Sequence, residues 1–303
     1  MARKRVPPRR SGFLTVDKPC GMTSHDVVGL VRRVTGERQV GHAGTLDPAA
    51  SGVLPIAVGH ATRALPFIED DDKRYVATVR FGVETDSGDR DGRLVAEADA
   101  SGLTRDQVEA LLPAFRGEIV QTPPMHSAIK VDGQRLYDLA RAGVSVDVPE
   151  RRVTIFDLEL VDWRPPEATL VIGCSKGTYI RSIARDLGVA AGSGAMLSSL
   201  VRTRAGMFDL SFAIPASELA SRLETHGWAA IALHPEAVMD GCDVVMLDED
   251  GQRRWFDGLP IEAGSRSPAA RVYDTGREWA GIGIADPATG RVQPRRVIRG
   301  TNE

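Results

Sequence analysis

The first part of the chain changes between two hydrophobic periods, which predicts strands separated by a helix. Residues 13–19, FLTVDKP, alternate in the way of a short strand and stop at a proline. Residues 24–36, SHDVVGLVRRVTG, instead place apolar side chains three or four residues apart, which is typical of a helix packed on one side, and Gly36 is its expected end. The continuous apolar run VLPIAV at 53–58 predicts a buried strand.

Further elements are predicted as far as residue 188. In 74–82, RYVATVRFG, every second side chain shares one face of a strand. Thr104 and Gln107 form a capping box, so a helix is expected to begin there. The remaining predicted elements are a strand, a turn and a short helix within 127–143, strands at 151–163 and 168–175, and a helix at 176–188 whose Arg181 and Arg185 lie on a different face from its apolar stripe.

The order of these elements favours an α+β fold on a mostly antiparallel sheet, because strands and helices do not alternate strictly. After about residue 240 the pattern changes to short strands and turns, which predicts a small β module. The basic start, MARKRVPPRR, is expected to be a disordered arm. We therefore expect an arm at 1–12, a large domain at 13–240 and a β module at 241–303.

Composition narrows the class of protein. The 303 residues, 42% hydrophobic and 26% charged, are typical of a soluble globular protein, and the sequence has neither a run that spans a bilayer nor a secretory signal. Cys20, Cys174 and Cys242 are too far apart for a zinc site and odd in number for a disulfide framework. These features predict a cytoplasmic protein. The net charge of −3 gives no overall basic signature for nucleic acid.

Several familiar motifs are incomplete. The acidic loop at 84–92, ETDSGDRDG, resembles a calcium loop but has Ala98 where the closing glutamate belongs, so we expect a solvated turn. GCSKG around Ser175 lacks the spacing of a nucleophile elbow, and the histidines lack ligand spacing. Neither a dinucleotide-binding nor a Walker sequence is present. The sequence thus predicts no cofactor and no metal.

The candidate catalytic and binding residues are polar or aromatic side chains next to the predicted apolar elements. Asp47 follows His42 in the glycine-rich run GHAGTLDP, Tyr75 opens a strand, and KGTYIR places Tyr179 and Arg181 at the start of a helix. Taken singly, each has a plainer explanation: an Asp-Pro turn, a packing tyrosine, a solvated arginine. Together they supply a carboxylate, a guanidinium that can pair with it, and aromatic surfaces, which suits binding and attack of a flat, uncharged ring.

Four collinear segments resemble the bacterial tRNA pseudouridine-55 synthases of the TruB type: GHAGTLDPAASGVLPIAVGHATR, DKRYVATVRFG, HSAIKVDGQRLYDLAR and CSKGTYIRSIARDLG. The resemblance covers about residues 13–206. It implies the pseudouridine-synthase fold. It departs at Ala43, where many members have threonine, and beyond about residue 240, where only length and β texture resemble the family's PUA-like RNA-binding module.

The resemblance also implies site roles. Asp47 matches the catalytic aspartate, and Arg181 matches the arginine that pairs with it. Tyr75 matches the tyrosine that stacks on the target base and is a candidate catalytic residue that moves a proton. The implied RNA contacts are His42, Tyr179 and Leu200, and Lys18 with Pro19 matches a structural DKP motif. Lys130 is a further candidate for substrate binding, because a basic side chain can contact phosphates.

The implied activity is isomerisation of uridine 55 in the TΨC stem-loop of tRNA, by base flipping, cleavage of the glycosidic bond and reattachment through C5. The implied partner is tRNA, with no membrane, no obligatory protein partner and a monomeric state. Whether Asp47 attacks the ribose, attacks the uracil ring or abstracts a proton stays open. Two other hypotheses remain: an RNA-folding chaperone whose catalysis is incidental, and a synthase that requires a guide RNA.

Overall fold

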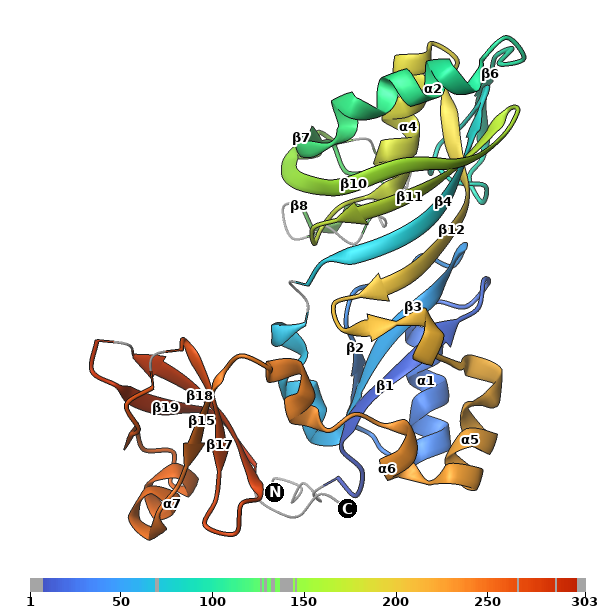
Figure 1. Ribbon diagram of the computed structural model, residues 1–303. Coiled ribbons are helices and arrows are strands. Elements are labelled where there is room, and N and C mark those ends of the chain that lie inside the picture. The colour runs from blue at the N-terminus through green and yellow to red at the C-terminus, as the bar shows by residue number, and fades with distance from the viewer. Residues whose placement is uncertain are drawn as a thin grey trace.

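The computed structural model describes residues 8–68, 71–125, 127, 130–131, 134–136, 144, 146–265, 267–286 and 288–298, and for residues 130, 131 and 135 only the backbone. These residues form a ten-stranded mixed sheet and, towards the C-terminus, a five-stranded sheet (Figure 1). The expected α+β fold with a mostly antiparallel sheet and flanking helices is confirmed. Most of the arm expected at 1–12 lies outside the described residues.

The large sheet has the strand order β14-β1-β3-β12-β4-β11-β10-β7, with β2 beside β3 and β13 beside β12. Its pairs are antiparallel except β1 with β14 and β3 with β12. The strands are β1 (Gly12–Lys18), β2 (Val40–His42), β3 (Ala50–Val58), β4 (Lys73–Phe81), β7 (Gly117–Gln121), β10 (Arg151–Arg164), β11 (Glu167–Cys174), β12 (Ala195–Ala205), β13 (Phe208–Asp209) and β14 (Ile214–Pro215). Two short hairpins stand apart from this sheet, β5 (Val83–Thr85) with β6 (Leu94–Glu97), and β8 (Lys130–Val131) with β9 (Gln134–Arg135).

The large sheet consists of two halves that meet at a narrow seam. The parallel pair of β3 and β12 spans only Leu200 with Ala50, Val201 with Ser51 and Arg202 with Gly52. One half contains β14, β1, β3 and β2, and the other contains β12, β4, β11, β10 and β7 (Figure 1). The helices beside the first half are α1 (Ser24–Thr35), α5 (Leu219–His226) and α6 (Trp228–Ile231), and those beside the second are α2 (Arg105–Leu111) and α4 (Ile180–Ala191).

Local sequence accounts for the ends of α1 and for the start of α2. Thr23 caps α1 in a capping box with Asp26, and Gly36 ends the helix in the left-handed conformation with φ of 73°. The predicted capping box of Thr104 and Gln107 is present at the start of α2. Both predicted helix starts are therefore confirmed, although α2 ends earlier than its apolar stripe because a 3-10 turn begins at Leu112.

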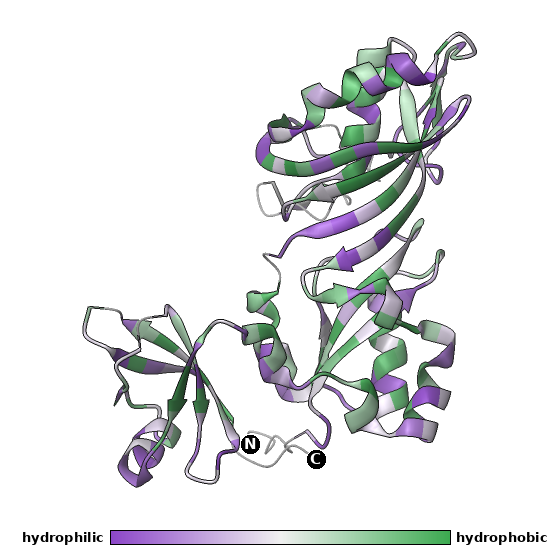
Figure 2. Ribbon diagram, in the orientation of Figure 1, coloured by the Kyte–Doolittle hydropathy of each residue, from purple (hydrophilic) through white to green (hydrophobic). Residues whose placement is uncertain are grey.

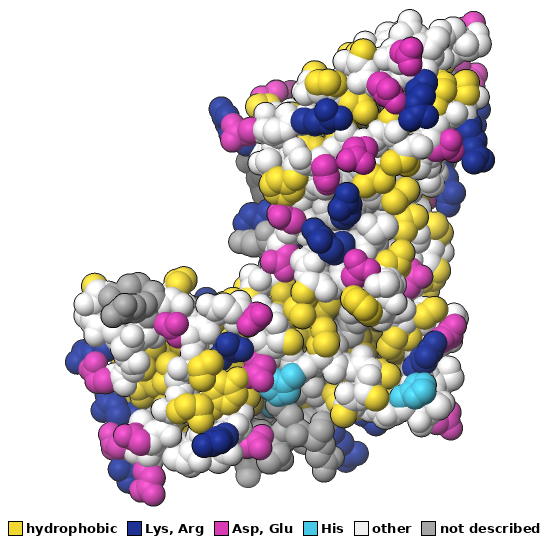
Figure 3. All heavy atoms as spheres, viewed as in Figure 1, with side chains coloured by type: hydrophobic (Ala, Val, Ile, Leu, Met, Phe, Trp, Pro, Cys, Tyr) yellow, Lys and Arg dark blue, Asp and Glu magenta, His cyan; other side chains and the backbone are white. Residues whose placement is uncertain are grey.

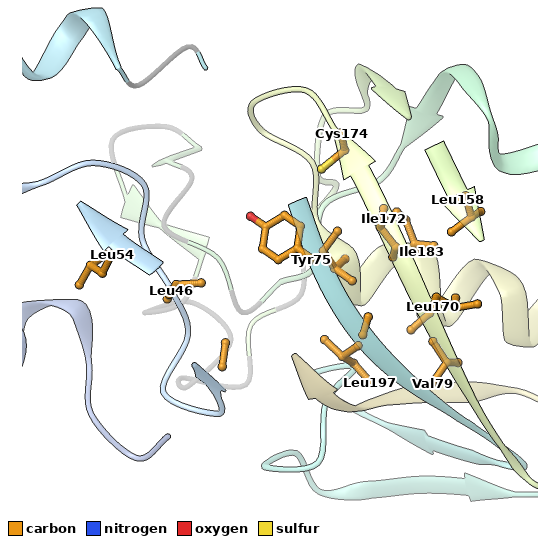
Figure 4. Close-up of a cluster of buried hydrophobic side chains, with 14 of the residues drawn as sticks. Leu46, Leu54, Tyr75, Val79, Leu158, Leu170, Ile172, Cys174, Ile183 and Leu197 are labelled. Atoms are coloured by element: carbon orange, nitrogen blue, oxygen red, sulfur yellow. The ribbon is translucent and has the colours of Figure 1, made fainter. Parts of the chain in front are cut away.

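Alternating burial along β4 confirms the predicted strand, with Tyr75, Ala77, Val79 and Phe81 on the inner face. These side chains join the main core together with β11 and α4. Figure 4 shows Tyr75 and Val79 beside Leu170, Ile172 and Ile183. The apolar positions follow the inner strands in Figure 2. Burying each large apolar side chain contributes about 1.5–3 kcal/mol, so this core holds the strands that carry the polar groups described below.

The smaller sheet has the order β15-β17-β18-β19-β16. Residues 243–258 were expected to form short strands and turns, but they also contain the helix α7 (Glu249–Phe256), so that expectation was wrong. Asp248 caps α7 by accepting from the Gly251 N–H at 2.7 Å, and Trp255 is fully buried in the module core. The strands are β15 (Asp243–Met246), β16 (Ile261–Glu262), β17 (Ala269–Tyr273), β18 (Trp279–Asp286) and β19 (Arg291–Val297).

A second hydrophobic cluster joins the two sheets. Trp279 and Ile282 of β18 share this cluster with Phe13 and Phe208 of the large sheet, and Arg63 donates to the Val297 carbonyl at 2.7 Å. On the face shown in Figure 3, Lys and Arg side chains are interspersed with Asp and Glu. No helix in the described part of the chain is long and apolar enough to cross a bilayer.

Candidate active site

Asp47 lies in the loop between β2 and β3, and hydrogen bonds to Gly21 and Ser24, just before and at the start of α1, fix this loop. The Ser24 hydroxyl, at the first residue of α1, donates to the Leu46 carbonyl at 3.2 Å and accepts from the Leu46 N–H at 2.9 Å. The Gly21 N–H donates to the Pro48 carbonyl at 2.8 Å. Leu46 is buried in the core. The backbone on both sides of Asp47 is therefore held to the segment before α1.

Asp47 forms an ion pair with Arg181, which comes from the first turn of α4. The Asp47 Oδ2 and Arg181 Nη2 atoms are 2.9 Å apart, and the arginine side chain is 6% exposed while the aspartate side chain is 41% exposed. The carboxylate thus has one open side, whereas its counter-charge lies inside the protein. The structure brings together the two groups that the sequence predicted as a pair, although Arg181 is buried rather than on an outer helix face.

A second carboxylate also faces Arg181. The Arg181 Nη1 atom lies 3.7 Å from Asp89 Oδ2 and donates to the Ser87 carbonyl at 3.0 Å. The Ser87 hydroxyl in turn donates to Asp89 Oδ1 at 2.6 Å. The Asp89 side chain is only 10% exposed, so the expectation that the whole acidic loop at 84–92 is a solvated turn was wrong. The loop folds back onto α4, where the buried guanidinium compensates the charge of Asp89.

Opposing effects act on the pKa of Asp47. Removal of the carboxylate from water is the largest and raises its pKa, the Arg181 guanidinium lowers it, and the nearby Asp89 charge raises it again. The net result is a pKa above the ordinary value for an aspartate. Asp47 therefore loses its negative charge at a higher pH than a solvated aspartate does.

Tyr75 lies at the start of β4 with its ring 8% exposed. Figure 4 shows its hydroxyl directed from the end of β4 towards the side where Leu46 and Leu54 lie. Burial raises the pKa of the phenol, the positive charge of Arg202 lowers it, and the charge of Asp47 raises it. Tyr75 thus keeps its proton at neutral pH and lies in the electrostatic field of both Arg202 and Asp47.

Tyr179 is the N-cap residue of α4, just before the first turn. The buried Gln121 side chain pairs with the Tyr179 backbone: its Oε1 atom accepts from the N–H at 3.1 Å, and its Nε2 atom donates to the carbonyl at 3.3 Å. The Arg151 guanidinium lies 5.4 Å from the centre of the Tyr179 ring. Gln121 therefore fixes the start of the helix that carries Arg181.

His42 ends β2, near the loop of Asp47. Its ring meets the ring of His25 edge to face, with centroids 5.8 Å apart. Its Nδ1 atom is buried and has no hydrogen-bond partner among the described residues. Burial, then the positive fields of His25 and Arg202, lower the pKa of His42 below its ordinary value. His42 is consequently a neutral ring at physiological pH.

A small, partly open pocket lies beside the Asp47 and Arg181 pair. Leu200 of β12 borders it from the far side of the seam, and Asp89 lies in its wall. Both halves of the sheet therefore contribute to the pocket. The lining residues are Asp47, Ala49, Ala50, Asp89, Arg181, Leu197, Ser198, Ser199 and Leu200.

The other residues predicted for the site have different outcomes. Lys130 belongs to β8, but its side chain lies outside the described residues. Lys18 is fully buried and donates to the Pro19 carbonyl at 2.9 Å and to the Met22 carbonyl at 2.7 Å, which agrees with a structural role for the DKP motif. Within the described residues, no group of three or more His, Cys, Asp or Glu side chains is placed to hold a metal ion.

Several residues of this site were not predicted from the sequence: Ser24, Ser87, Asp89, Gln121 and Arg202. A signal existed for Ser24, because a serine at the first turn of a capped helix often bonds to a neighbouring backbone. Asp89 and Arg202 carried no such signal, since a charged residue in a loop or a strand is usually solvated.

A comparison with protein families places this chain among pseudouridylate synthases. The model for the TruB family pseudouridylate synthase, N-terminal domain, matches residues 32–180. The chain is 44% identical over 291 residues to the tRNA pseudouridine synthase B of Gloeobacter violaceus, covering 95% of this chain and 98% of that protein. It is 42% identical over 306 residues to the tRNA pseudouridine synthase B of Pseudomonas aeruginosa, covering 98% of each.

Solved structures with a similar fold come from larger assemblies. The chain matches one from a Cbf5-Nop10-Gar1 complex with a TM-score of 0.71 and 23% identity, covering 98% of this chain and 90% of that chain. It also matches a chain from an H/ACA RNP bound to a substrate RNA containing 2'-deoxyuridine, with a TM-score of 0.69 and 20% identity, covering 99% of this chain and 93% of that chain. At this identity the likeness shows a shared fold.

Proposed function

Because the chain belongs to the TruB family of pseudouridylate synthases, we propose that it isomerises uridine 55 in the TΨC loop of tRNA to pseudouridine. The observation that carries this proposal is the Asp47–Arg181 pair, 2.9 Å apart, with the carboxylate open to a small pocket and the guanidinium buried. Breaking the C1′–N1 bond, turning the uracil and rejoining it through C5 consumes no electrons and no energy source. The reaction needs a positioned carboxylate and a site that encloses the base.

Asp47 is the residue that acts on the flipped uridine. A bound base covers the exposed part of the Asp47 carboxylate, and this further desolvation favours the protonated form. The Arg181 guanidinium opposes that effect and keeps the carboxylate ionised. The same pair serves each of the three open mechanisms, because attack on the ribose, attack on the ring and abstraction of a proton all require an anionic Asp47.

Tyr75 and Leu200 are proposed to enclose the target base. Stacking on an aromatic ring contributes about 1–3 kcal/mol per base, which offsets part of the cost of flipping the uridine. The C5 atom loses its hydrogen when the new bond forms, and the Tyr75 hydroxyl, close enough to Asp47 to feel its charge, is a suitable group to relay that proton.

The RNA stem is proposed to lie over the open side of the pocket. His42 and Tyr179 are assigned to RNA contact by their match to the family, and Lys130 and the arm at 1–12 are candidates for phosphate contact because they are basic. A neutral His42 ring fits between stacked bases without the cost of burying a charge. Because lysine and arginine contacts to phosphates release counterions, tRNA binding should weaken as salt rises. We also propose that 13–240 form the catalytic domain and 241–303 an RNA-binding module.

The test is turnover of an unmodified tRNA transcript labelled with tritium at C5 of uridine, because reattachment at C5 releases the label. The purified chain alone should release it, and mass-spectrometric mapping should locate one pseudouridine at position 55. Asp47→Asn should abolish release while tRNA binding stays within about threefold of wild type. Asp91→Asn is the matched control, since Asp91 is 58% exposed and pairs only loosely with Arg90 among the described residues.

The same assay separates the other hypotheses. Release from naked tRNA by the purified chain excludes a requirement for guide RNA, which the fold likeness to H/ACA assemblies makes worth testing. A tRNA-folding assay with Asp47→Asn measures any chaperone activity, because that activity should survive the loss of chemistry. Turnover by Asp47→Asn at the wild-type rate would contradict the proposed role of Asp47.

A further inference from the structure

The candidate site has a structural weak point, because its groups come from both halves of the large sheet. Asp47 is carried by the loop before β3, whereas Tyr75 and Arg181 are carried by β4 and α4 of the other half. The halves are joined in the sheet only at the short parallel pairing of β3 with β12. A small shift at this seam would move the Asp47 carboxylate relative to both partners.

Arg202 is the residue whose side chain crosses this seam. Its backbone in β12 pairs with Gly52 of β3 on one side and with Tyr75 of β4 on the other. Its Nε atom donates to the Val53 carbonyl at 2.7 Å, and its Nη2 atom donates to the Gly44 carbonyl at 2.9 Å. These two carbonyls lie on either side of Asp47 in the sequence, so one guanidinium holds both ends of the loop that carries it.

Arg202 also lies beside Tyr75 in the sheet, and the positive charge of its guanidinium acts on the phenol. The loop of Asp47 and the strand that carries Tyr75 therefore both adjoin Arg202. The approach to the loop is close: a Cβ atom built on Gly44 would lie 3.1 Å from Arg202 Nη1, and Gly44 has φ of +73°. Glycine at this position lets the guanidinium pack directly against the backbone.

The burial of Arg202 requires an explanation. Its side chain is 1% exposed, and among the described residues no carboxylate lies within ion-pair distance of it. A guanidinium is costly to remove from water without a counter-charge. Lys18 is nearby and equally buried, and the positive charge of Arg202 acts on it unfavourably. A residue needed only for packing would be apolar here, whereas donors aimed at two carbonyls of one loop have a geometric role.

We infer that Arg202 is a positioning residue: from its place beside Tyr75 in the sheet, its side chain holds the Asp47 loop in register with Tyr75 across the seam, so that both reach the base together. The inference rests on the proposed function of this site. Arg202 does not line the pocket, so it acts through these two groups rather than by touching the base. Its loss is expected to slow the chemical step and to leave tRNA binding nearly unchanged.

The experiment compares Arg202→Lys, Arg202→Met and the control Arg204→Met. Lysine keeps the charge but cannot donate to both carbonyls in one plane, and methionine removes every donor at similar length. Arg204 lies on the same strand with an exposed side chain, so its variant controls for loss of an arginine from β12. Single-turnover rates are measured with excess enzyme on the C5-tritiated transcript, below the thermal midpoint of each variant, and tRNA dissociation constants are measured in parallel.

A structural readout accompanies the kinetics. The chain has four tyrosines, so a sample labelled with ¹³C at the tyrosine Cζ position gives a simple spectrum, and Tyr75→Phe identifies the Tyr75 signal. We expect Arg202→Lys to move this signal and to slow the single turnover by about 100-fold, as a misplacement of about 1 Å does. The dissociation constant should change by less than about threefold, and Arg204→Met should keep its rate within about twofold of wild type.

Each outcome supports or overturns the inference. A folded Arg202→Lys protein with the wild-type rate overturns it, as does a variant that is less stable but whose folded fraction turns over normally, because the residue would then serve stability alone. If Arg202→Met does not fold, Arg202→Lys decides. If the wild-type chain does not release tritium from tRNA, the proposed function fails. The Tyr75 signal still tests the positioning role in that case, and an unmoved signal in Arg202→Lys overturns it.

Discussion

Replacing Asp89 by asparagine tests whether the second carboxylate beside Arg181 serves the first. Asp89 keeps its place through the Ser87 hydroxyl, which donates to its Oδ1 atom, and an amide oxygen accepts the same bond. The substitution therefore removes a charge with little change of shape. The Arg181 guanidinium then loses the partner that lies 3.7 Å from its Nη1 atom and keeps the Ser87 carbonyl and Asp47.

The distances set the expected size of the effect. Opposite charges about 4 Å apart attract by about 4 kcal/mol at an effective dielectric constant near 20, and the cost of burying both groups offsets much of this. At 3.7 Å the contact is an ion pair and not a hydrogen bond, so we take a net contribution of about 1.5–3 kcal/mol, below the Coulomb value. If this free energy no longer helps to orient Arg181 in the transition state, the single-turnover rate with Asp89→Asn should fall by about 10- to 150-fold.

Asp89→Asn should also change how the rate depends on pH, in a direction that a general loss of structure would not give. The charge of Asp89 raises the pKa of Asp47, so its removal lowers that pKa. Because Asp47 must be ionised to react, the rate is lost as the pH falls through its pKa, and the acid limb of the profile should shift to lower pH in Asp89→Asn. The tritium-release rate is measured against pH for wild type, Asp89→Asn and the control Asp91→Asn.

Two results would refute this reasoning. A folded Asp89→Asn protein with a rate within twofold of wild type would show that Arg181 is oriented without Asp89. An acid limb that shifts to higher pH would show that the dominant effect of Asp89 on Asp47 is not the repulsion of like charges.

Further predictions concern neighbouring groups. Gln121→Leu removes both side-chain bonds at the start of α4. It should lower the free energy of unfolding by about 1–3 kcal/mol and slow turnover. The control Gln39→Leu replaces an exposed side chain, and denaturation and kinetic assays should show neither effect for it. The pKa of Cys174 is about 11 because of burial, so a thiol reagent at pH 8 should modify the exposed Cys20 and spare Cys174 until the protein unfolds, as peptide mapping can show. His42, with its lowered pKa, should titrate below pH 6.5 by NMR, and tRNA affinity at constant salt should therefore change little between pH 6.5 and 8; a titration above 6.5 would contradict the burial argument.

Periodicity and capping made much of the fold predictable. The stripe of α1, the capping box of α2 and the alternation of β4 each depend on neighbours close in sequence, so local physical chemistry fixes them. The helix α7 was missed because Gly251 weakens the helical pattern by about 1 kcal/mol. Its N-cap at Asp248 and the burial of Trp255 offset that loss, and the second of these depends on the folded module.

The site could be predicted only in part, for a related reason. The Asp47 and Arg181 pair could be proposed because both residues stand in recognisable turns at the ends of apolar elements. Asp89 and Arg202 could not, because their burial depends on contacts between elements distant in sequence: a hairpin loop folding onto α4, and β12 inserting between β3 and β4. A single sequence shows that a residue is charged, whereas its desolvation is a property of the assembled sheet.

The two buried arginines of the site can be explained by its position at the seam between the two half-sheets. A pocket at a seam between two half-sheets can enclose a base from both sides, but the backbone pairing there is short and gives little rigidity. The half that contains α4 and β12 therefore supplies polar side chains that reach across to the loop of Asp47. Arg181 reaches from α4 to Asp47, and Arg202 reaches from β12 to the Gly44 and Val53 carbonyls. These two buried arginines carry a desolvation cost that apolar residues would avoid, and the cost is offset by holding one loop in place from two directions. The stability of this seam and the geometry of the reaction are thus set by the same hydrogen bonds.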